Sequence, residues 1–216
     1  MKRRIWTRKR KALSLTAVTL VLFSLFQYTY GICLMHPAQA RWEAEQFYGC
    51  GSTERICHVQ DAAVGQRVAL SSNENALLLI GTYSTLSGWS CRDRDAVDCT
   101  EDAPFHGGTL RLSDGMTEDV VYAYGRIDDP SIDKVQLSFC FAADEMSPAE
   151  THIYLTDKAS WHEKDGQRYF LLRSDALMPA YASDSGRPRQ INQGIIRDCT
   201  LTALDKHGTV LAEIKT

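Results

Sequence analysis

Six cysteines are the most reactive side chains in this chain, and their spacing is typical of disulfide bonds. They are Cys50, Cys57, Cys91, Cys99, Cys140 and Cys199, and a seventh, Cys33, lies in an apolar segment near the N-terminus. An even number of thiols in an oxidising compartment predicts disulfides, although six cysteines permit 15 pairings. We prefer Cys50–Cys57 and Cys91–Cys99, which close short loops, and Cys140–Cys199, which joins two strand-like segments.

Thiol–disulfide exchange is the alternative chemistry for these cysteines. An exchanging thiol usually belongs to a Cys-x-x-Cys motif at a helix start, which lowers its pKa. Here the two close pairs have six and seven residues between them. The sequence also has no Gly-x-Ser-x-Gly motif, and its histidines lack the spacing of zinc ligands. We therefore predict no catalytic residues, no metal ligands and no cofactor.

Two loop-like stretches carry side chains that suit a binding surface. The candidate residues are Tyr83, Trp89 and Phe105 in the first stretch, and Tyr181, Arg187 and Arg189 in the second. The first three flank the segment that a Cys91–Cys99 bond would close, and a rigid loop loses little entropy on docking. The second stretch covers residues 175–193, and loops of that length are often functional. An alternative for Trp89 is a place in the hydrophobic core.

The N-terminal segment predicts where these groups work. Residues 1–11 form a basic head with seven Lys and Arg, and residues 12–35 contain no charged side chain. This pattern predicts a cytoplasmic head and one transmembrane signal-anchor helix over residues 12–35, with the C-terminal part outside the cell. Residues 36–48 would form a juxtamembrane stalk. Cleavage after Ala40, which would release a secreted protein, is the alternative.

The remainder of the chain has the size of one acidic domain. Residues 1–40 hold seven of the 24 basic residues and none of the 27 acidic ones, so residues 41–216 keep 17 against 27, a formal net charge of −10. Such a surface repels nucleic acid, which we exclude as a partner. We assign residues 49–216 to a single extracytoplasmic domain, because no long linker divides them.

Short strands separated by turn residues dominate this domain. Residues 133–141 alternate, with Val135, Leu137, Phe139 and Phe141 on one face, as in a half-buried strand. Residues 194–204 and 209–214 flank a turn that ends in Gly208 and predict a hairpin. Seven to nine such strands and no sustained helical period predict a mainly β fold. We expect an antiparallel β-sandwich, preferably Ig-like, stapled by disulfides, with a partly open barrel as the alternative.

Two phrases in the C-terminal half resemble small exported or membrane-anchored β-domain proteins of Gram-positive bacteria. They are Tyr124-Gly-Arg-Ile-Asp-Asp-Pro-Ser-Ile-Asp-Lys-Val135 and Leu204-Asp-Lys-His-Gly-Thr-Val-Leu211, within residues 118–216. The resemblance implies an exported β-domain in which the first phrase precedes a strand and the second forms a closing hairpin. That group is largely uncharacterised, so the resemblance implies no catalytic residues.

The sequence as a whole predicts a non-catalytic binding or accessory module of the cell envelope. Its partner would be a protein or envelope component at the membrane surface, where a tether raises the effective concentration of the module. An extracytoplasmic thiol–disulfide oxidoreductase, or another envelope enzyme, is the alternative function.

Overall fold

The computed structural model of this chain describes residues 2–30, 37–85, 88–114, 118–142, 147–177 and 194–216. Within these ranges the chain forms two α-helices, one short 3-10 helix and twelve strands. The helices are α1 (Lys2–Tyr30), α2 (Pro37–Tyr48) and η1 (Lys158–Ser160).

The strands pair antiparallel in three sheets of four strands each. Sheet A is a meander of β1 (Glu54–Asp61), β2 (Gln66–Ser72), β3 (Ala76–Thr85) and β4 (Gly88–Asp98). Sheet B has the order β5 (Phe105–Ser113), β6 (Asp119–Ile127), β10 (Gln167–Arg173) and β9 (His162–Lys164). Sheet C has the order β12 (Val210–Lys215), β11 (Ile195–Leu204), β7 (Lys134–Ala142) and β8 (Glu150–Asp157).

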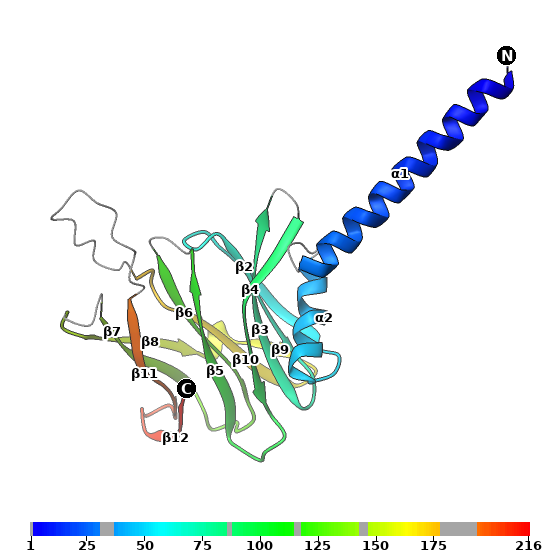
Figure 1. The fold of residues 1–216 in the computed structure, drawn as a ribbon. Helices are drawn as coiled ribbons and strands as arrows, with labels where there is room; N and C mark the ends of the chain where they lie inside the picture. Colours follow the sequence, from blue (N-terminus) through cyan, green and yellow to red (C-terminus); the bar gives the residue numbers. More distant parts are fainter. Residues whose placement is uncertain (1, 31–36, 86–87, 115–117, 143–146, 178–193) are drawn as a thin grey trace, which may run out of the picture.

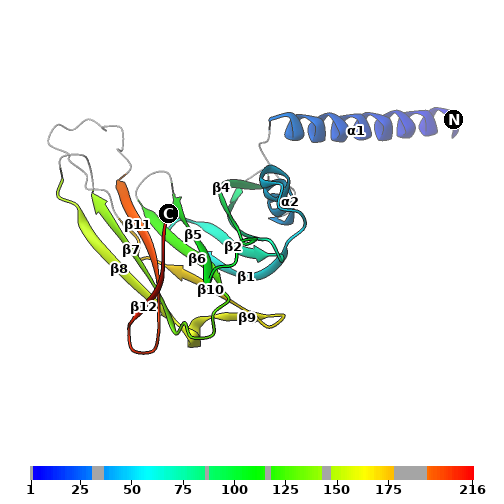
Figure 2. The ribbon, with the colours of Figure 1, turned by 90° about the horizontal axis from the view of Figure 1, so that it is seen from below.

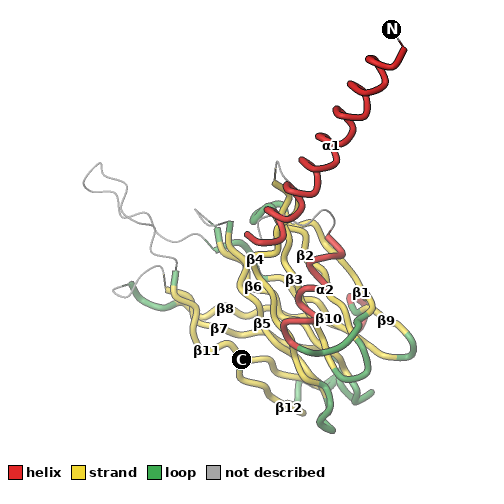
Figure 3. The backbone as a smooth tube through the Cα atoms, turned by 45° about the vertical axis from the view of Figure 1, so that its right-hand side comes forward, coloured by secondary structure: helices red, strands yellow, loops and turns green. Residues whose placement is uncertain are grey.

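Sheet B is the middle layer of the molecule. One cluster of buried side chains, including Phe139 and Phe170, joins sheet B to sheet C. A second cluster, including Leu70 and Tyr122, joins sheet B to sheet A. On the other face of sheet A, Ala44 of α2 packs against the strands. The layers therefore run α2, sheet A, sheet B, sheet C, while α1 projects away from them (Figure 1; Figure 3).

Strand β6 shows how the sequence suits a middle layer. Tyr122 faces sheet A and Ala123 faces sheet C, and both are almost completely buried. Gly125 lies opposite Gly107 of β5, and a Cβ atom on it would lie 2.3 Å from the ring of Phe170. Phe170 pairs with Gly125 from β10, the next strand of the same sheet, so the missing side chain makes room for this ring.

The two clearest strand predictions are confirmed. Strand β7 buries Val135, Leu137 and Phe139 and leaves the intervening side chains partly exposed. The C-terminal hairpin forms from β11 and β12, where the Asp205 amide donates to the Thr209 carbonyl oxygen at 3.0 Å. Gly208 has φ +85° in that turn, a backbone conformation that glycine adopts without strain.

The mainly β, antiparallel architecture is as predicted, but the layering is not that of a two-sheet Ig-like sandwich. Sheet A is the additional layer, and it contains β4, which we had expected to be a polar loop between Cys91 and Cys99. Its acidic side chains find partners in the fold: Asp95 Oδ2 accepts a hydrogen bond from the Tyr124 hydroxyl at 2.8 Å. A tertiary contact thus holds a polar segment in an extended conformation.

The predicted transmembrane helix is not found. The apolar run was expected to reach Met35, whereas α1 ends at Tyr30 and begins within the basic head. Polar Thr16 and Thr19 interrupt the run, and each hydroxyl donates to the carbonyl four residues earlier. No helix among the described residues is both long and apolar enough to span a bilayer. The prediction of a single-pass membrane protein, with a cytoplasmic N-terminus and an extracytoplasmic C-terminal domain, is therefore wrong.

The segment expected to be a stalk instead packs on the domain. Residues Pro37–Tyr48 form α2, which ends where Gly49 has φ +64°. Ala40 and Ala44 of this helix are fully buried against Leu78 and Ile80 of β3. The cleavage point considered after Ala40 would therefore fall inside a folded helix, next to a residue of its buried face.

The disulfide predictions are also wrong, because all six described cysteines are free. Cys91 packs on the α2 side of sheet A, whereas Cys99, eight residues further along the chain, packs between sheets A and B. Eight residues of extended chain cover about 26 Å, and a disulfide needs Cα atoms roughly 4–7 Å apart.

The other two predicted pairs are separated in a similar way. Cys140 lies on the outer face of sheet C, where its sulfur is 3.8 Å from Thr151 Oγ1, whereas Cys199 packs against the cluster between sheets B and C. Cys50 follows α2, whereas Cys57 packs between sheets A and B. Neither pair is bonded, and Cys140 and Cys199 lie on opposite faces of sheet C.

Candidate functional site

A small pocket lies where α2 meets the outer face of sheet A. Its volume is about 80 Å³, room for several waters or one small anion but below the roughly 300–1,000 Å³ of a site for a drug-sized ligand. Basic side chains and small or aliphatic residues share the lining, which consists of Ala38, Arg41, Arg55, Arg67, Ala69, Ser71, Ile80 and Thr82.

Strand alternation brings the pocket residues together. Arg67, Ala69 and Ser71 follow one another on the same face of β2. Arg55 of β1 pairs with Ser71, and Ile80 of β3 pairs with Ala69. Ala69 is the smallest of these side chains and lies between the two strand arginines, so it leaves the hollow that their side chains surround.

Helix α2 supplies the third arginine. Arg41 Nε lies 3.5 Å from Glu45 Oε1, one helical turn away. The same Glu45 oxygen accepts hydrogen bonds from the Thr53 amide at 2.7 Å and the Thr53 hydroxyl at 2.6 Å. Glu45 thus fixes α2 to the start of β1 and partly balances the charge of Arg41.

The two strand arginines have no such balance. Among the described residues, no carboxylate lies within ion-pair distance of Arg55 or Arg67. The pocket therefore combines three guanidinium groups, of which Arg41 alone has an ion pair, with Glu45, in a chain whose formal net charge is −3. Glu54, whose lowered pKa is due mainly to Lys164, is also affected by the charge of Arg41. A concave surface of one charge sign concentrates its field and attracts ions of the opposite sign.

The pKa of His58 is affected by the positive charge of these arginines. His58 pairs with Ala69 from the neighbouring strand β1 and is exposed. The charge of Arg67 is the largest cause of a lowered pKa for the His58 imidazole, and burial and Arg55 add to it. A cationic surrounding disfavours the protonated imidazole, as it would favour an anion.

Ser71 adds a hydrogen-bonding group without a partner. The residue is 1% exposed, and its hydroxyl oxygen has no hydrogen-bond partner among the described residues. Leaving a buried hydroxyl unpaired costs roughly 1–3 kcal/mol. Since Ser71 lines the pocket, an oxygen atom bound there would accept its hydrogen bond.

The first group of predicted binding residues does not form one surface. Phe105 is 1% exposed and fills the core between sheets B and C. Tyr83 and Trp89 are half-buried at the end of the β3–β4 hairpin, where Tyr83 pairs with Ser90 and Ser84 pairs with Trp89. Adjacent pairs point to opposite faces, so the two aromatic side chains diverge.

The second predicted group, Tyr181, Arg187 and Arg189, lies outside the described residues, as does Cys33. The pocket residues Arg41, Arg55, Arg67 and Ser71 were not predicted. One signal for them was present, because Arg67, Ala69 and Ser71 alternate with buried Val68 and Leu70. This pattern marks an outer strand face with an unusually small central residue, but it does not reveal that α2 and Arg55 complete a pocket.

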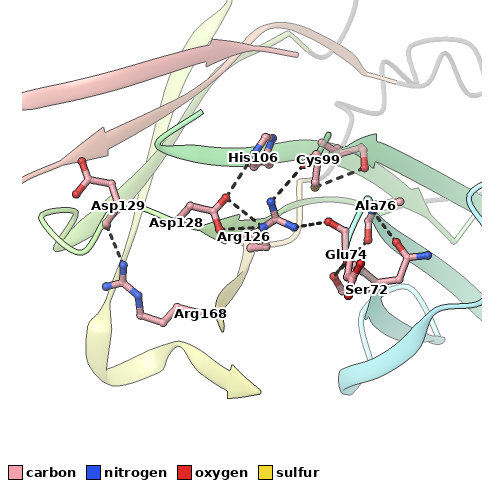
Figure 4. Close-up of polar contacts among 11 residues, drawn as sticks. Ser72, Glu74, Ala76, Cys99, His106, Arg126, Asp128, Asp129 and Arg168 are labelled. Atoms are coloured by element: carbon pink, nitrogen blue, oxygen red, sulfur yellow. Dashed lines mark hydrogen bonds and ion pairs between the residues drawn. The ribbon is translucent and has the colours of Figure 1, made fainter. Parts of the chain in front are cut away.

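A second polar cluster, built around Arg126, joins sheet A to sheet B (Figure 4). The Arg126 guanidinium donates to Asp128 Oδ2 at 3.1 Å, to the Glu74 carbonyl at 2.9 Å and to the Cys99 carbonyl at 3.3 Å. His106 Nε2 lies 3.4 Å from the same Asp128 oxygen. These contacts connect the β2–β3 turn and the end of β4 in sheet A with sheet B.

Five of the six described thiols have raised pKa values and are therefore poor nucleophiles at neutral pH. The pKa of Cys57, of Cys91 and of Cys99 is raised to about 11, and burial of the thiol is the largest cause of each shift. Burial also raises the pKa of Cys50 and Cys199. A reactive thiol requires a lowered pKa that stabilises the thiolate. These cysteines therefore act in the folded chain as small apolar side chains.

Comparison of this chain with protein families, with curated proteins and with solved structures finds no match. The resemblance to exported β-domain proteins of Gram-positive bacteria stays a prediction.

Proposed function

We propose that this chain is a binding module that takes up an oxyanion, the phosphate, sulfate or carboxylate group of its ligand, in the pocket between α2 and sheet A. One observation carries this proposal: three arginines surround a pocket whose buried Ser71 hydroxyl has no partner. Arginine is the side chain best suited to such groups, because its planar fork of donors matches two oxygen atoms at once.

The lining favours binding over catalysis. Within the described part of the chain, it provides guanidinium groups, two hydroxyls and apolar side chains, and no lining carboxylate, imidazole or thiol that would act as a base or nucleophile. A bound oxyanion would instead replace water around the arginines and accept the Ser71 hydrogen bond. A pocket of about 80 Å³ would hold the anionic end of a larger partner, whose remainder would extend into solvent.

The experiment is a titration of the full chain with inorganic phosphate, sulfate and acetate, followed by isothermal calorimetry and by NMR of the arginine side chains. A sulfated polysaccharide serves as a further probe, to distinguish a free ion from an anionic polymer. We expect saturable binding, with perturbations at Arg55 and Arg67. Arg67→Gln should weaken binding about tenfold, since one charge-assisted hydrogen bond is worth roughly 1.5–3 kcal/mol.

Two variants make the test specific. Arg197→Gln removes an exposed arginine from sheet C, and binding should be unchanged. Ser71→Ala should weaken binding while leaving the fold at least as stable, because it removes an unpaired buried hydroxyl. Absence of saturable binding, or an equal loss in Arg197→Gln and Arg67→Gln, would reject the proposal.

A further inference from the structure

Strand β8 leaves one edge of sheet C open, and its side chains are unusually apolar for an edge. Sheet C ends at β8, and no described residue pairs with the outer side of that strand. Figure 2 shows β8 as the outermost strand of this sheet. Ile153 and Leu155 lie on its outer face and are 58% and 57% exposed.

Edge strands usually carry a charge or a proline that prevents pairing with another chain. Residues 151–156 of β8 contain neither, and the charged groups occur only at its ends, at Glu150, Asp157 and the following Lys158. The opposite edge strand, β12, has Glu213 and Lys215 within its six residues. Of the two edges of sheet C, β8 is therefore the one that offers free backbone groups without an obstacle.

The sequence of β8 is complementary to itself in one antiparallel register. With a two-fold axis at Tyr154, Ile153 lies opposite the partner's Leu155, and the symmetry repeats that apolar pair. In the same register Glu150 lies at the end of the partner's β8, beside the partner's Lys158, the first residue of η1, and the symmetry repeats this contact as well. Lys158 is 47% exposed, and its Nζ forms an ion pair with Asp133 Oδ1 at 3.2 Å, so the partner's Glu150 would be a second carboxylate for it. Glu150 is exposed with no ion pair among the described residues.

Other registers lose this match. A shift of the axis to Ile153 keeps a single apolar pair, Ile153 opposite the partner's Ile153. It places Leu155 opposite the partner's Thr151 and Glu150 opposite the partner's Thr156, so one apolar pair and both charge pairs are lost. An axis between two residues would place inward side chains opposite outward ones, because side chains alternate along a strand. The inner face also favours the axis at Tyr154. On that face the Tyr154 ring stacks on the Phe139 ring with 6.0 Å between the centroids, and the partner's Tyr154 would lie next to it and lengthen this row of aromatic rings.

We infer that two copies of this chain form a symmetric dimer through antiparallel pairing of their β8 strands. The two sheets C would then form one continuous sheet of eight strands, and a two-fold interface of this kind is self-limiting. The inference does not depend on the proposed anion site, which lies on the outer face of sheet A. Because the contact involves one strand from each copy, we expect affinity in the micromolar range.

Sedimentation of the full chain over a range of concentrations tests the inference. We expect a monomer–dimer equilibrium that Ile153→Lys and Leu155→Lys each weaken by about tenfold or more, since each substitution occurs twice and places a charge at the pairing edge. Val210→Lys is the matched control, an aliphatic residue of equal exposure, 57%, on the opposite edge. It should leave the equilibrium unchanged.

Charge exchange tests the register itself. Glu150→Lys and Lys158→Glu should each weaken the dimer, because like charges then meet at both ends, whereas the double variant should restore it. A chain that stays monomeric at all concentrations overturns the inference. So does a dimer that the β8 substitutions leave intact, because exposed apolar residues of α1 would then explain it. A double variant as weak as the single ones overturns the register.

Discussion

Replacement of Asp61 by asparagine should lower the free energy of unfolding, because Asp61 connects sheet A with sheet B. Asp61 ends β1 and is 2% exposed. Its carboxylate accepts hydrogen bonds from the Tyr122 hydroxyl at 2.6 Å, from Arg173 Nε at 2.7 Å and Nη2 at 3.0 Å, and from the Ala63 amide at 3.0 Å. Three segments of the chain therefore meet at one buried charge.

The structure sets the size of the effect. Breaking a buried ion pair typically costs about 3–5 kcal/mol. Arg173 is 35% exposed and can regain water, so we take the lower limit, about 3 kcal/mol, for Asp61→Asn. Tyr122 is 1% exposed, and Tyr122→Phe removes one hydrogen bond to a charged group, for which we expect a loss of about 2 kcal/mol.

The effect should depend on pH. Burial raises the pKa of Asp61, but hydrogen bonds from Arg173 and Tyr122 outweigh it, and the pKa is lowered overall. A carboxyl with a lowered folded-state pKa stabilises the fold above its unfolded pKa, near 3.9. That contribution is lost as the pH falls through the folded-state value. The difference between wild type and Asp61→Asn should therefore be complete at pH 7 and shrink below about pH 4.

Urea denaturation followed by tryptophan fluorescence, at several pH values, measures these differences. Glu163→Gln removes an exposed carboxylate from sheet B and should leave the midpoint unchanged. The reasoning is refuted if Asp61→Asn is as stable as wild type at pH 7. A difference that persists undiminished at low pH would refute the electrostatic origin of the effect.

Three further predictions follow from contacts described above. Phosphate binding should raise the lowered pKa of the His58 imidazole. The affinity of the chain for phosphate should therefore increase as the pH falls below about 6.5 and His58 becomes protonated. NMR titration of the imidazole with and without phosphate measures the pKa, and an unchanged pKa would contradict the prediction. The thiols of Cys57, Cys91 and Cys99, with pKa values of about 11, should be alkylated at pH 8 roughly 10²-fold more slowly in the folded chain than in urea; equal rates by mass spectrometry would disprove their burial. Gly125→Ala places a Cβ 2.3 Å from the His106 carbonyl oxygen and should lower stability by about 1–3 kcal/mol. Gly166→Ala, which meets open space at φ +77°, should cost about 1 kcal/mol for the backbone alone, and a larger loss there than at Gly125 would contradict the packing argument.

The parts of the fold that depend on local signals were predictable. The β11–β12 hairpin needs a turn with a glycine at positive φ, and Gly208 marks it in the sequence. The alternation of β7 reflects one buried face, which the pattern of Val135, Leu137 and Phe139 records directly. Such features depend on neighbours within a few residues, so composition and period are sufficient to find them.

The parts that depend on distant contacts were not predictable. Residues 92–98 are mostly charged, which disfavours a strand, yet Tyr124 holds Asp95 in β4 from another sheet. Val120, Tyr122 and Tyr124 alternate along β6 as in a strand with one buried face, but Val121 and Ala123 are buried on the other face as well. The pocket needs Arg41, which α2 brings from outside the sheet, and no local pattern marks that packing.

The interleaved order of strands in sheets B and C has a consequence for synthesis of the chain. Sheet A can form as soon as residue 98 has been made, because its four strands are consecutive. Strand β6 pairs with β10 in sheet B, and strands β7 and β8 of sheet C are synthesised between them. Strand β7 pairs with β11 in sheet C, and strands β9 and β10 of sheet B are synthesised between them. Along the sequence, strands of each sheet therefore lie between two paired strands of the other sheet. Chains truncated before residue 195 should therefore lack β11 and β12 and leave one edge of β7 unpaired. Sheets B and C should form one cooperative unit only in chains that contain these final strands.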